Sequence, residues 1–420
     1  MAIFTKTYNN GLRLCLDKTD KNVIGVNILF FVGSRNEQKN EEGYSHFIEH
    51  LMFKSSENFS TEEIADKLTF YGADFNASTS RRVTRYNFKC LAENFEPCFE
   101  IYSDMILRPK YMTEEMDKER NVVIEEMKRC ADDPVEVLYA KVMENYFDGD
   151  TFAHDELGTE DIISNVSREE LLEYKNRFYK PENCVVSISG KIELETVEKA
   201  IERYFVFGSE TERTPNLVKF ETKTPTIKNK YDIVDRDDNQ ANVCVHIKST
   251  NADGDKKYIA ELYTSILGNS QNSRLYKTIR EELGLVYSIY AFSDSRDNSG
   301  EIFIIFGTRP KNIELAMTEI KKIILDLAES GVSDAELERA KNLKKSSVEY
   351  LSETSSDRAE INATMMHYYN QIISVDEKKC KFDAVTKEDI LKFAKQIANE
   401  ENFNVVAVGK KLNIDHIKKF

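Results

Sequence analysis

The order of strand and helix signals in the first half of the chain recurs in the second half. The segment ENCVVSISGKIELETVEKAI combines an apolar run, Gly190-Lys and the start of an amphipathic pattern, and ENFNVVAVGKKLNIDHIKKF repeats this order around Gly409. Gly72 and Gly284 each close a helical pattern before a strand pattern. The two pairs of glycines are 219 and 212 positions apart. Two repeated features at nearly the same distance along the sequence predict two halves that share one order of strands and helices.

The length of the chain also favours two domains, because 420 residues are too many for one ordinary hydrophobic core. Continuous apolar runs such as VIGVNILFFVGS predict strands with both faces covered, and longer patterns with a helical period predict helices. We therefore expect an α+β fold of two similar α/β-sandwich domains in tandem, with mixed or antiparallel sheets covered by helices. The predicted domains are residues 1–210 and 233–420. Residues 211–232 hold two of the seven prolines and many polar residues, which predicts a linker.

Composition and charge argue against several functional classes. The net charge of −15 disfavours nucleic acid as the main partner and mildly favours basic or neutral substrates. No long apolar stretch is present, so we expect no membrane span and no signal peptide. The seven cysteines are scattered without a Cys-x-x-Cys pair, which is typical of a reducing compartment. The sequence therefore predicts a cytoplasmic protein with neither nucleic acid nor membrane as a partner.

The stretch GYSHFIEHLMFKSS, residues 43–56, places two of only six histidines close together. On a helix, His46 and His50 share one face, so both imidazoles can bind one metal ion, and Glu49 lies beside them. Glu49 is better placed to contact a metal-bound water than the metal. The pattern reverses the His-Glu-x-x-His order of zinc peptidases. A catalytic zinc needs a third protein ligand and an open position, and without them the motif is a pair of surface histidines on an amphipathic helix.

The helical stretch KERNVVIEEMKRCADDP offers candidates for the third ligand. Glu119 and Glu126 are seven positions apart, two turns along one face. Such a helix could present one carboxylate to a metal ion and hold a second one just behind it. Glu125 is predicted to lie on the solvated surface of the helix. The spacing alone does not say which carboxylate is a ligand.

Several stretches together resemble the M16 family of zinc peptidases, the inverzincins, which include the mitochondrial processing peptidases, pitrilysin and insulysin. The likeness is greatest to the single-unit bacterial members. Glu126 follows His50 by 76 positions, which is the family spacing for the third ligand. The other similar stretches span both halves of the chain: HFIEHLMFKSS, GADFNASTS with Tyr86 following, LGTEDIISNVSREELLEYKNRFYKPENCVVSISGKI and NSRLYKTIREELGLVYSIYAF.

The resemblance implies a role for each matching residue around the metal. His46, His50 and Glu126 bind Zn²⁺, one ion per chain. Glu49 is the general base that takes a proton from the zinc-bound water and later passes it to the leaving amine. Glu119 orients a ligand histidine through its second ring nitrogen.

The resemblance also implies residues that contact the substrate. Arg280 and Tyr287 match the family's Arg–Tyr pair by residue type and spacing, and are expected to hold the substrate backbone and stabilise the oxyanion. An open sheet edge is expected to receive an extended peptide as an added strand. This edge consists of Asn76, Ala77, Ser78 and Thr79.

These expectations define a zinc-dependent endopeptidase that cleaves short or unfolded peptides inside a chamber. Full proteases of the family contain twice as many such α+β units as this chain, so we expect a homodimer, with a heterodimer containing a second M16 chain as the alternative. The alternative function is a non-catalytic scaffold of the same fold, or the partner subunit of a heterodimeric peptidase. The presence of His46, Glu49, His50 and Glu126 argues against it. A third hypothesis is a zinc-dependent hydrolase that acts on a substrate other than a peptide.

Overall fold

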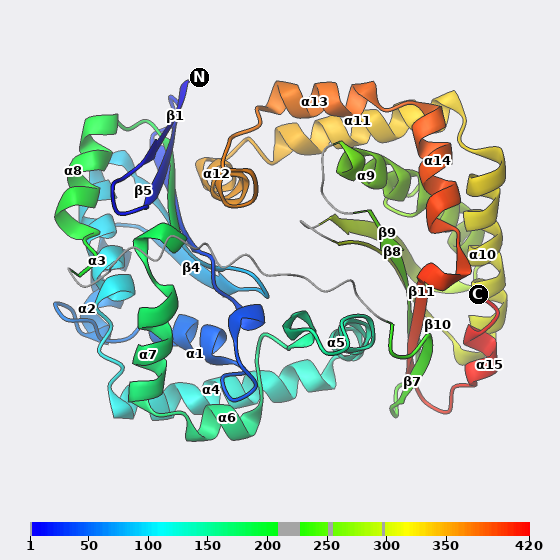
Figure 1. The fold of residues 1–420 in the computed structure, drawn as a ribbon, viewed down its shortest axis with the longest axis horizontal. Helices are drawn as coiled ribbons and strands as arrows, with labels where there is room; N and C mark the ends of the chain where they lie inside the picture. Colours follow the sequence, from blue (N-terminus) through cyan, green and yellow to red (C-terminus); the bar gives the residue numbers. More distant parts are fainter. Residues whose placement is uncertain (1, 209–226, 251–254, 296–298) are drawn as a thin grey trace. The chain divides into compact units, whose positions relative to one another are not determined.

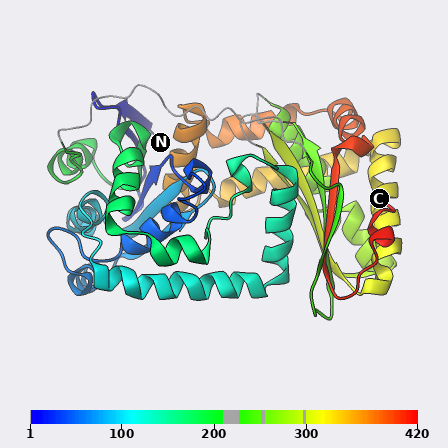
Figure 2. The same cartoon turned by 60° about the horizontal axis from the view of Figure 1, so that its bottom comes forward.

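The computed structural model describes residues 2–208, 227–250, 255–295 and 299–420 (Figure 1). These residues form two compact units. The first consists of residues 2–128, 154–208 and 351–373, and the second consists of the described residues within 129–153, 221–350 and 374–420. We call them unit 1 and unit 2. The boundary after Lys128 falls inside a long helix, α4 (Thr113–Asp132), which Figure 2 shows as one continuous coil.

Unit 1 is built on a mixed sheet of six strands in the order β1-β2-β6-β3-β5-β4. The pair β2–β6 is parallel and the other neighbours are antiparallel. The strands are β1 (Ala2–Thr7), β2 (Arg13–Lys18), β3 (Val23–Phe30), β4 (Asp74–Thr79), β5 (Thr84–Leu91) and β6 (Cys184–Gly190). At one edge of this described sheet, β4 pairs with β5 alone.

Helices cover both faces of this sheet. The larger core lies under α1, α3, α7 and α8, while α12 packs against β3, β6 and β2 on the other face, as Figure 1 shows. Burial on both faces explains the apolar run of β3, in which every residue after Val23 is buried. The helices of unit 1 are α1 (Tyr44–Leu51), α2 (Thr61–Phe70), α3 (Phe95–Leu107), α6 (Glu160–Asn165), α7 (Arg168–Phe178), α8 (Leu194–Tyr204) and α12 (Ser355–Tyr369).

Unit 2 is built on a mixed sheet of five strands in the order β7-β11-β8-β10-β9. The pair β7–β11 is parallel and the others are antiparallel. The strands are β7 (Tyr231–Asp235), β8 (Ala241–Ser249), β9 (Val286–Ser295), β10 (Gly300–Thr308) and β11 (Phe403–Gly409). This order repeats that of unit 1 without a counterpart of β1.

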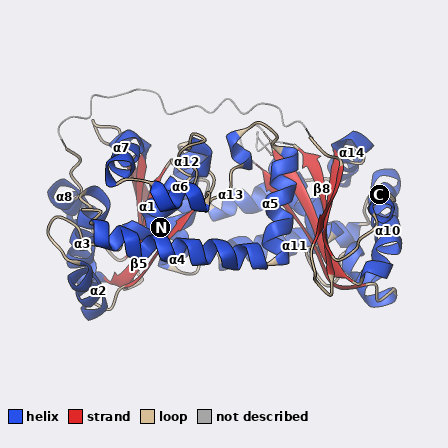
Figure 3. Cartoon of the chain, turned by 90° about the horizontal axis from the view of Figure 1, so that it is seen from below, coloured by secondary structure: helices blue, strands red, loops and turns tan. Residues whose placement is uncertain are grey.

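Helices also cover both faces of the second sheet. The helix α5 packs on β8 and β11, on the face opposite α10 and α14 (Figure 3). The helices of unit 2 are α5 (Pro134–Tyr146), α9 (Lys256–Leu267), α10 (Ile313–Ser330), α11 (Asp334–Tyr350), α13 (Val375–Ala384), α14 (Lys387–Ile397) and α15 (Ile414–Ile417). The helical pattern that the sequence predicts before Gly284 is a π-helix, Tyr276–Glu282.

The predicted two-domain α+β fold with mixed sheets covered by helices is confirmed. The glycines that carry the repeat in the sequence occupy matching places. Gly190 and Gly409 end β6 and β11 with φ angles of 142° and 156°, and Gly72 and Gly284 precede β4 and β9 with φ angles of 66° and 59°. Such angles favour glycine because a side chain would be strained there.

The compact units differ from the continuous ranges 1–210 and 233–420 because each includes one helix from the opposite half of the sequence. The helix α5 covers the sheet of unit 2, and α12 covers the sheet of unit 1. A helical pattern shows which side of a helix is apolar but not which sheet it will cover, so this exchange was not predicted. Of the predicted linker 211–232, residues 211–226 lie outside the described residues, and β7 begins at Tyr231. The linker remains a proposal.

Candidate metal centre

The start of α1 is fixed by a buried carboxylate. Glu37 accepts hydrogen bonds of 2.8 Å from the backbone N–H groups of Gly43 and Ser45, which satisfies donors at the helix N-terminus. Gly43 has a φ of 94°, and a Cβ there would lie 2.6 Å from the carbonyl oxygen of Leu157. Burial raises the pKa of Glu37 to about 8, although these hydrogen bonds act in the opposite direction. The capping carboxylate and the glycine together set where α1 begins.

The opposite sides of α1 have different tasks. Its apolar side chains enter the core of unit 1: Phe47, Ile48 and Leu51. The other side carries His46, Glu49 and His50, which are partly buried. The helix predicted to carry both histidines on one face is therefore present as α1, and its apolar face packs against the core.

Three side chains converge beside α1. The Nε2 atom of His46 lies 3.6 Å, and that of His50 3.4 Å, from Oε2 of Glu126 on α4. One ligand atom from each of these residues lies within 4.8 Å of the others. Glu125, the neighbour of Glu126, is exposed and pairs with Lys128 at 2.7 Å, as predicted for a surface residue. The structure thus brings Glu126 rather than Glu125 to the two histidines.

The donor set suits a zinc ion. Two nitrogens and a carboxylate oxygen are common zinc ligands, and two ligands bonded at about 2.1 Å to a tetrahedral zinc lie about 3.4 Å apart. The contacts of 3.4 and 3.6 Å between the imidazole nitrogens and the Glu126 carboxylate fit that separation. Without a cation, burial lowers the pKa of His46 to about 4, with the neighbouring His50 acting in the same direction. A neutral imidazole is the form that binds metal.

Glu119 holds the second histidine. Its Oε2 lies 3.2 Å from Nδ1 of His50, so the Nδ1–H donates to the carboxylate and Nε2 faces Glu126. Lys54 pairs with the other oxygen of Glu119 at 2.6 Å, a contact that the sequence did not reveal. Burial opposes protonation of His50, but the hydrogen bond to Glu119 and nearby carboxylates outweigh it and raise the His50 pKa. The Glu119 pKa is lowered because the contacts with His50 and Lys54 exceed the effect of burial.

Glu49, next to the three converging side chains on α1 and α4, also contacts the edge strand. The helix α1 packs against β4, and the hydroxyl of Thr79 donates a 2.8 Å hydrogen bond to Oε2 of Glu49. Burial raises the pKa of Glu49, while the Thr79 hydrogen bond acts against that rise. A carboxyl group with a raised pKa is suited to accept and return a proton.

The predicted substrate edge is the outermost described strand of the unit 1 sheet. Asn76 and Ser78 are exposed, whereas Ala77 is buried and Thr79 is half-buried beside Glu49. Side chains alternate along a strand, so this pattern places the first two on one face and the others toward α1. The side chain of Thr79 thus faces Glu49, which the sequence did not indicate.

Arg280 and Tyr287 belong to unit 2. Arg280 is exposed on the π-helix, where its guanidinium lies 4.6 Å from the ring centre of Tyr276 and donates to that tyrosine's hydroxyl. Tyr287 on β9 is 49% exposed, and its hydroxyl accepts a 3.1 Å hydrogen bond from Nε of Arg309. Short π-helical turns are rare and often occur at functional sites. Nothing in the sequence pattern pointed to Tyr276 or Arg309.

Two family models match the chain. The model described as Insulinase (Peptidase family M16) matches residues 14–160, and the model described as Peptidase M16 inactive domain matches residues 165–344. The chain belongs to the M16 peptidase family. The first match contains the convergent residues of α1 and α4, and the second contains Arg280 and Tyr287.

Several known proteins resemble this chain over nearly their whole length. A Bacillus subtilis protein named uncharacterized zinc protease YmxG is 27% identical over 396 residues, covering 94% of this chain and 95% of that protein. A protease from Helicobacter pylori matches with a TM-score of 0.88 and 22% identity, over 97% of this chain and 99% of that one. A Pseudomonas fluorescens structure described as peptidase M16 inactive domain matches with a TM-score of 0.87 and 16% identity, over 98% and 99%. At these identities the two solved structures show the fold alone.

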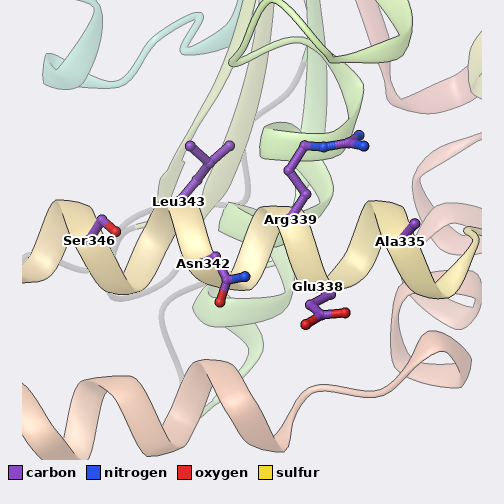
Figure 4. Close-up of a pocket in the computed structure, with 6 residues that line it drawn as sticks. All are labelled: Ala335, Glu338, Arg339, Asn342, Leu343 and Ser346. Atoms are coloured by element: carbon purple, nitrogen blue, oxygen red, sulfur yellow. The ribbon is translucent and has the colours of Figure 1, made fainter.

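Two further features lie outside the metal centre. Within the described ranges, no helix combines the length and apolar character that a membrane crossing requires. A shallow depression follows one face of α11 in unit 2 (Figure 4). Its lining residues include none of the predicted site residues: Ala335, Glu338, Arg339, Asn342, Leu343 and Ser346.

Proposed function

We propose that this M16 family member is a zinc-dependent endopeptidase that cleaves short or unfolded peptides. The observation that carries the proposal is the convergence of His46, His50 and Glu126 beside the partly buried Glu49. Residues from two helices far apart in the chain meet there with the donor chemistry and the spacing of a zinc site. The name of the Bacillus subtilis relative, a zinc protease, supports the same activity.

The three converging side chains would hold the metal. When bound there, zinc would supply Lewis-acid chemistry that lowers the pKa of a water and polarises the scissile carbonyl. Glu49 takes a proton from the attacking water and gives it to the leaving amine. Glu119 fixes the ring of His50 by accepting from its Nδ1–H, which keeps Nε2 directed at the metal position.

The edge strand β4 would bind the substrate as an additional strand. Its outer backbone groups can pair with an extended peptide along Asn76, Ala77, Ser78 and Thr79. Backbone pairing recognises an extended conformation more than a particular sequence. The substrate would therefore be a short peptide or an unfolded segment.

Arg280 and Tyr287 would contact the substrate backbone and the developing oxyanion. Both are exposed polar side chains, and each has a neighbour that restricts its orientation. A positioned donor of this kind stabilises charge that develops in the transition state. The chamber, the homodimer, the single zinc ion per chain and the cytoplasmic location follow from the family resemblance and the composition, and belong to the same proposal.

The variant Glu49→Gln tests the proposed function. The amide cannot accept a proton from water, so kcat should fall by about 10²- to 10⁴-fold while zinc content stays the same. Zinc content and cleavage of an unfolded peptide, with and without a chelator, are measured together. The control is Glu125→Gln, which makes the same chemical change on the exposed side of α4 and should leave both quantities unchanged.

Two outcomes would assign another function. A wild-type protein that binds zinc and peptide but cleaves neither peptides nor other substrates would be a scaffold. Chelator-sensitive turnover of a substrate other than a peptide would support the metal centre but not the proposed binding of a peptide by β4. Normal peptide cleavage by Glu49→Gln would show that Glu49 is not the base.

A further inference from the structure

The hydroxyl of Thr79 is directed at the proposed base. Thr79 is the last residue of β4 and lies opposite Thr84 of β5 in the sheet. Its Oγ1 donates to Oε2 of Glu49 at 2.8 Å, and both residues are partly buried. Family likeness placed Thr79 on the substrate edge but gave its side chain no task.

We propose that Thr79 is a positioning residue that holds the carboxylate of Glu49 in its reactive orientation. The inference deepens the proposed function and rests on it. A glutamate side chain has three rotatable torsions, so its carboxylate needs a fixed partner to keep one orientation. Threonine suits this task because it is branched at Cβ and therefore stiff, and because its strand is held by pairing with β5. With Oε2 bonded to the Thr79 hydroxyl, Oε1 of Glu49 would be the oxygen that accepts the proton of the reacting water.

In this arrangement the strand β4 has two roles, one for its backbone and one for a side chain. The outer backbone of β4 would pair with the peptide, while the Thr79 side chain, on the face toward α1, holds the base. The hydroxyl is engaged by Glu49 rather than being presented to the substrate. Loss of the hydroxyl should therefore lower kcat with little change in KM, whereas a side chain that binds substrate directly would change KM.

The variants Thr79→Val and Thr79→Ser separate the hydroxyl from the shape of the side chain. Valine keeps the branched shape and removes the donor, so kcat should fall by about 10- to 100-fold, as expected for a hydrogen bond to a charged group. Serine keeps the donor and should restore most of the activity. The dissociation constant for zinc, measured against a chromophoric chelator, should be the same in all three proteins because Thr79 does not contact the metal-binding residues.

Thr84→Val is the matched control. It removes the hydroxyl of the cross-strand neighbour, which donates to the carbonyl oxygen of Val32 at 2.9 Å and not to Glu49. This variant should lower the melting temperature without lowering kcat of the folded protein. The comparison separates loss of a strand hydroxyl in general from loss of the contact with Glu49.

A crystal structure of Thr79→Val with zinc provides a readout that does not depend on activity. The Glu49 carboxylate should leave the position that it occupies in the wild-type protein. An active wild type with equal kcat in Thr79→Val, or an unmoved Glu49, would overturn the inference and leave the proposed function standing. An inactive wild-type protein would overturn the proposed function and the inference with it.

Discussion

The two units share one strand order but differ in one helix, which follows β3 in unit 1 and the equivalent strand β8 in unit 2. In unit 1, α1 carries His46, Glu49 and His50 on its partly buried side. In unit 2, the corresponding helix α9 contains no histidine, and most of its side chains are buried in the core. Among the described residues, the one group of three convergent metal-ligand side chains lies in unit 1. The shared plan therefore supplies the scaffold, and the side chains of α1 and α4 in unit 1 supply the candidate metal ligands.

The units also resemble each other in how their sheets are covered. In each, one helix from the opposite half of the sequence covers the second face of the sheet: α12 in unit 1 and α5 in unit 2. In unit 1 the approach is close enough to require a glycine on the sheet. A Cβ on Gly25 of β3 would lie 2.5 Å from backbone atoms of Ser355, the first residue of α12. A Cβ on Gly307 of β10 would meet its nearest atom at 3.5 Å, which is ordinary contact.

The largest expected effect is loss of the metal from unit 1. His46→Ala removes one of three converging ligands, so the protein should no longer retain zinc and should lose peptidase activity. His416→Ala is the control in unit 2, since His416 also lies near a carboxylate, 3.7 Å from Glu314. Zinc per chain is measured by mass spectrometry after dialysis. Equal zinc loss in both variants would remove the distinction between the units.

The next effect concerns the contribution of unit 2. Arg280→Ala and Tyr287→Phe should each lower kcat/KM by about 10²- to 10³-fold, the range for removal of one oxyanion donor, with zinc content unchanged. Tyr290→Phe, at another exposed tyrosine of β9, is the control and should behave as wild type. If the variants of Arg280 and Tyr287 lose zinc or unfold, their role is structural.

A smaller effect is expected for the glycine that α12 approaches. Gly25→Ala should destabilise the protein by about 1–3 kcal/mol, because the added methyl group meets backbone that cannot move aside easily. Gly307→Ala should change stability by less than about 1 kcal/mol, since the added methyl group would meet its neighbours at ordinary contact distance. Urea unfolding of the two variants gives the comparison. Equal stability of both would mean that α12 does not pack closely on β3.

The smallest effects are opposite dependences of stability on pH. The folded-state pKa of Glu37 in unit 1 is raised by burial from 4.5 to about 8, so the free energy of unfolding should decrease as pH rises between those values. The slope should be at most about 1.4 kcal/mol per pH unit. In unit 2, burial acts against ionisation of Glu336, but contacts with Arg274 and Ser333 outweigh it and lower its pKa from 4.5 to about 2. That contribution should be lost as pH falls through this range.

Substitution tests both dependences. Glu37→Gln should flatten the stability profile between pH 4.5 and about 8, and Glu336→Gln should flatten it below pH 4.5. The free energy of unfolding is measured in urea at a series of pH values for both variants and wild type. Profiles parallel to wild type in these windows would contradict the assigned causes.

Much of the fold could be predicted because its signals are local. The apolar run of β3 and the repeated Gly190 and Gly409 are found as predicted. The exchange of α5 and α12 could not be predicted, since it depends on contacts between residues hundreds of positions apart. The π-helix could not be predicted either, because such turns are rare and a helical pattern is interpreted with the α-helical period.

The candidate site likewise contains residues that a local motif indicated and contacts that the sequence did not reveal. His46, Glu49 and His50 form a local motif, so the residues themselves indicated metal chemistry. The position of Glu126 came from the spacing in related proteins, and the structure brings it to both histidines. The contacts made by Lys54, Thr79 and Arg309 left no pattern in the sequence because each joins two elements through a single side chain.

The most direct test of the account is X-ray diffraction at the zinc absorption edge from crystals of the wild-type protein. The account predicts an anomalous peak in unit 1, bonded to Nε2 of His46, Nε2 of His50 and a carboxylate oxygen of Glu126 at about 2.0–2.2 Å. The Glu49 carboxylate should lie next to the peak without bonding to it. A peak at other residues, or a Glu126 carboxylate outside bonding distance of the zinc, would contradict it.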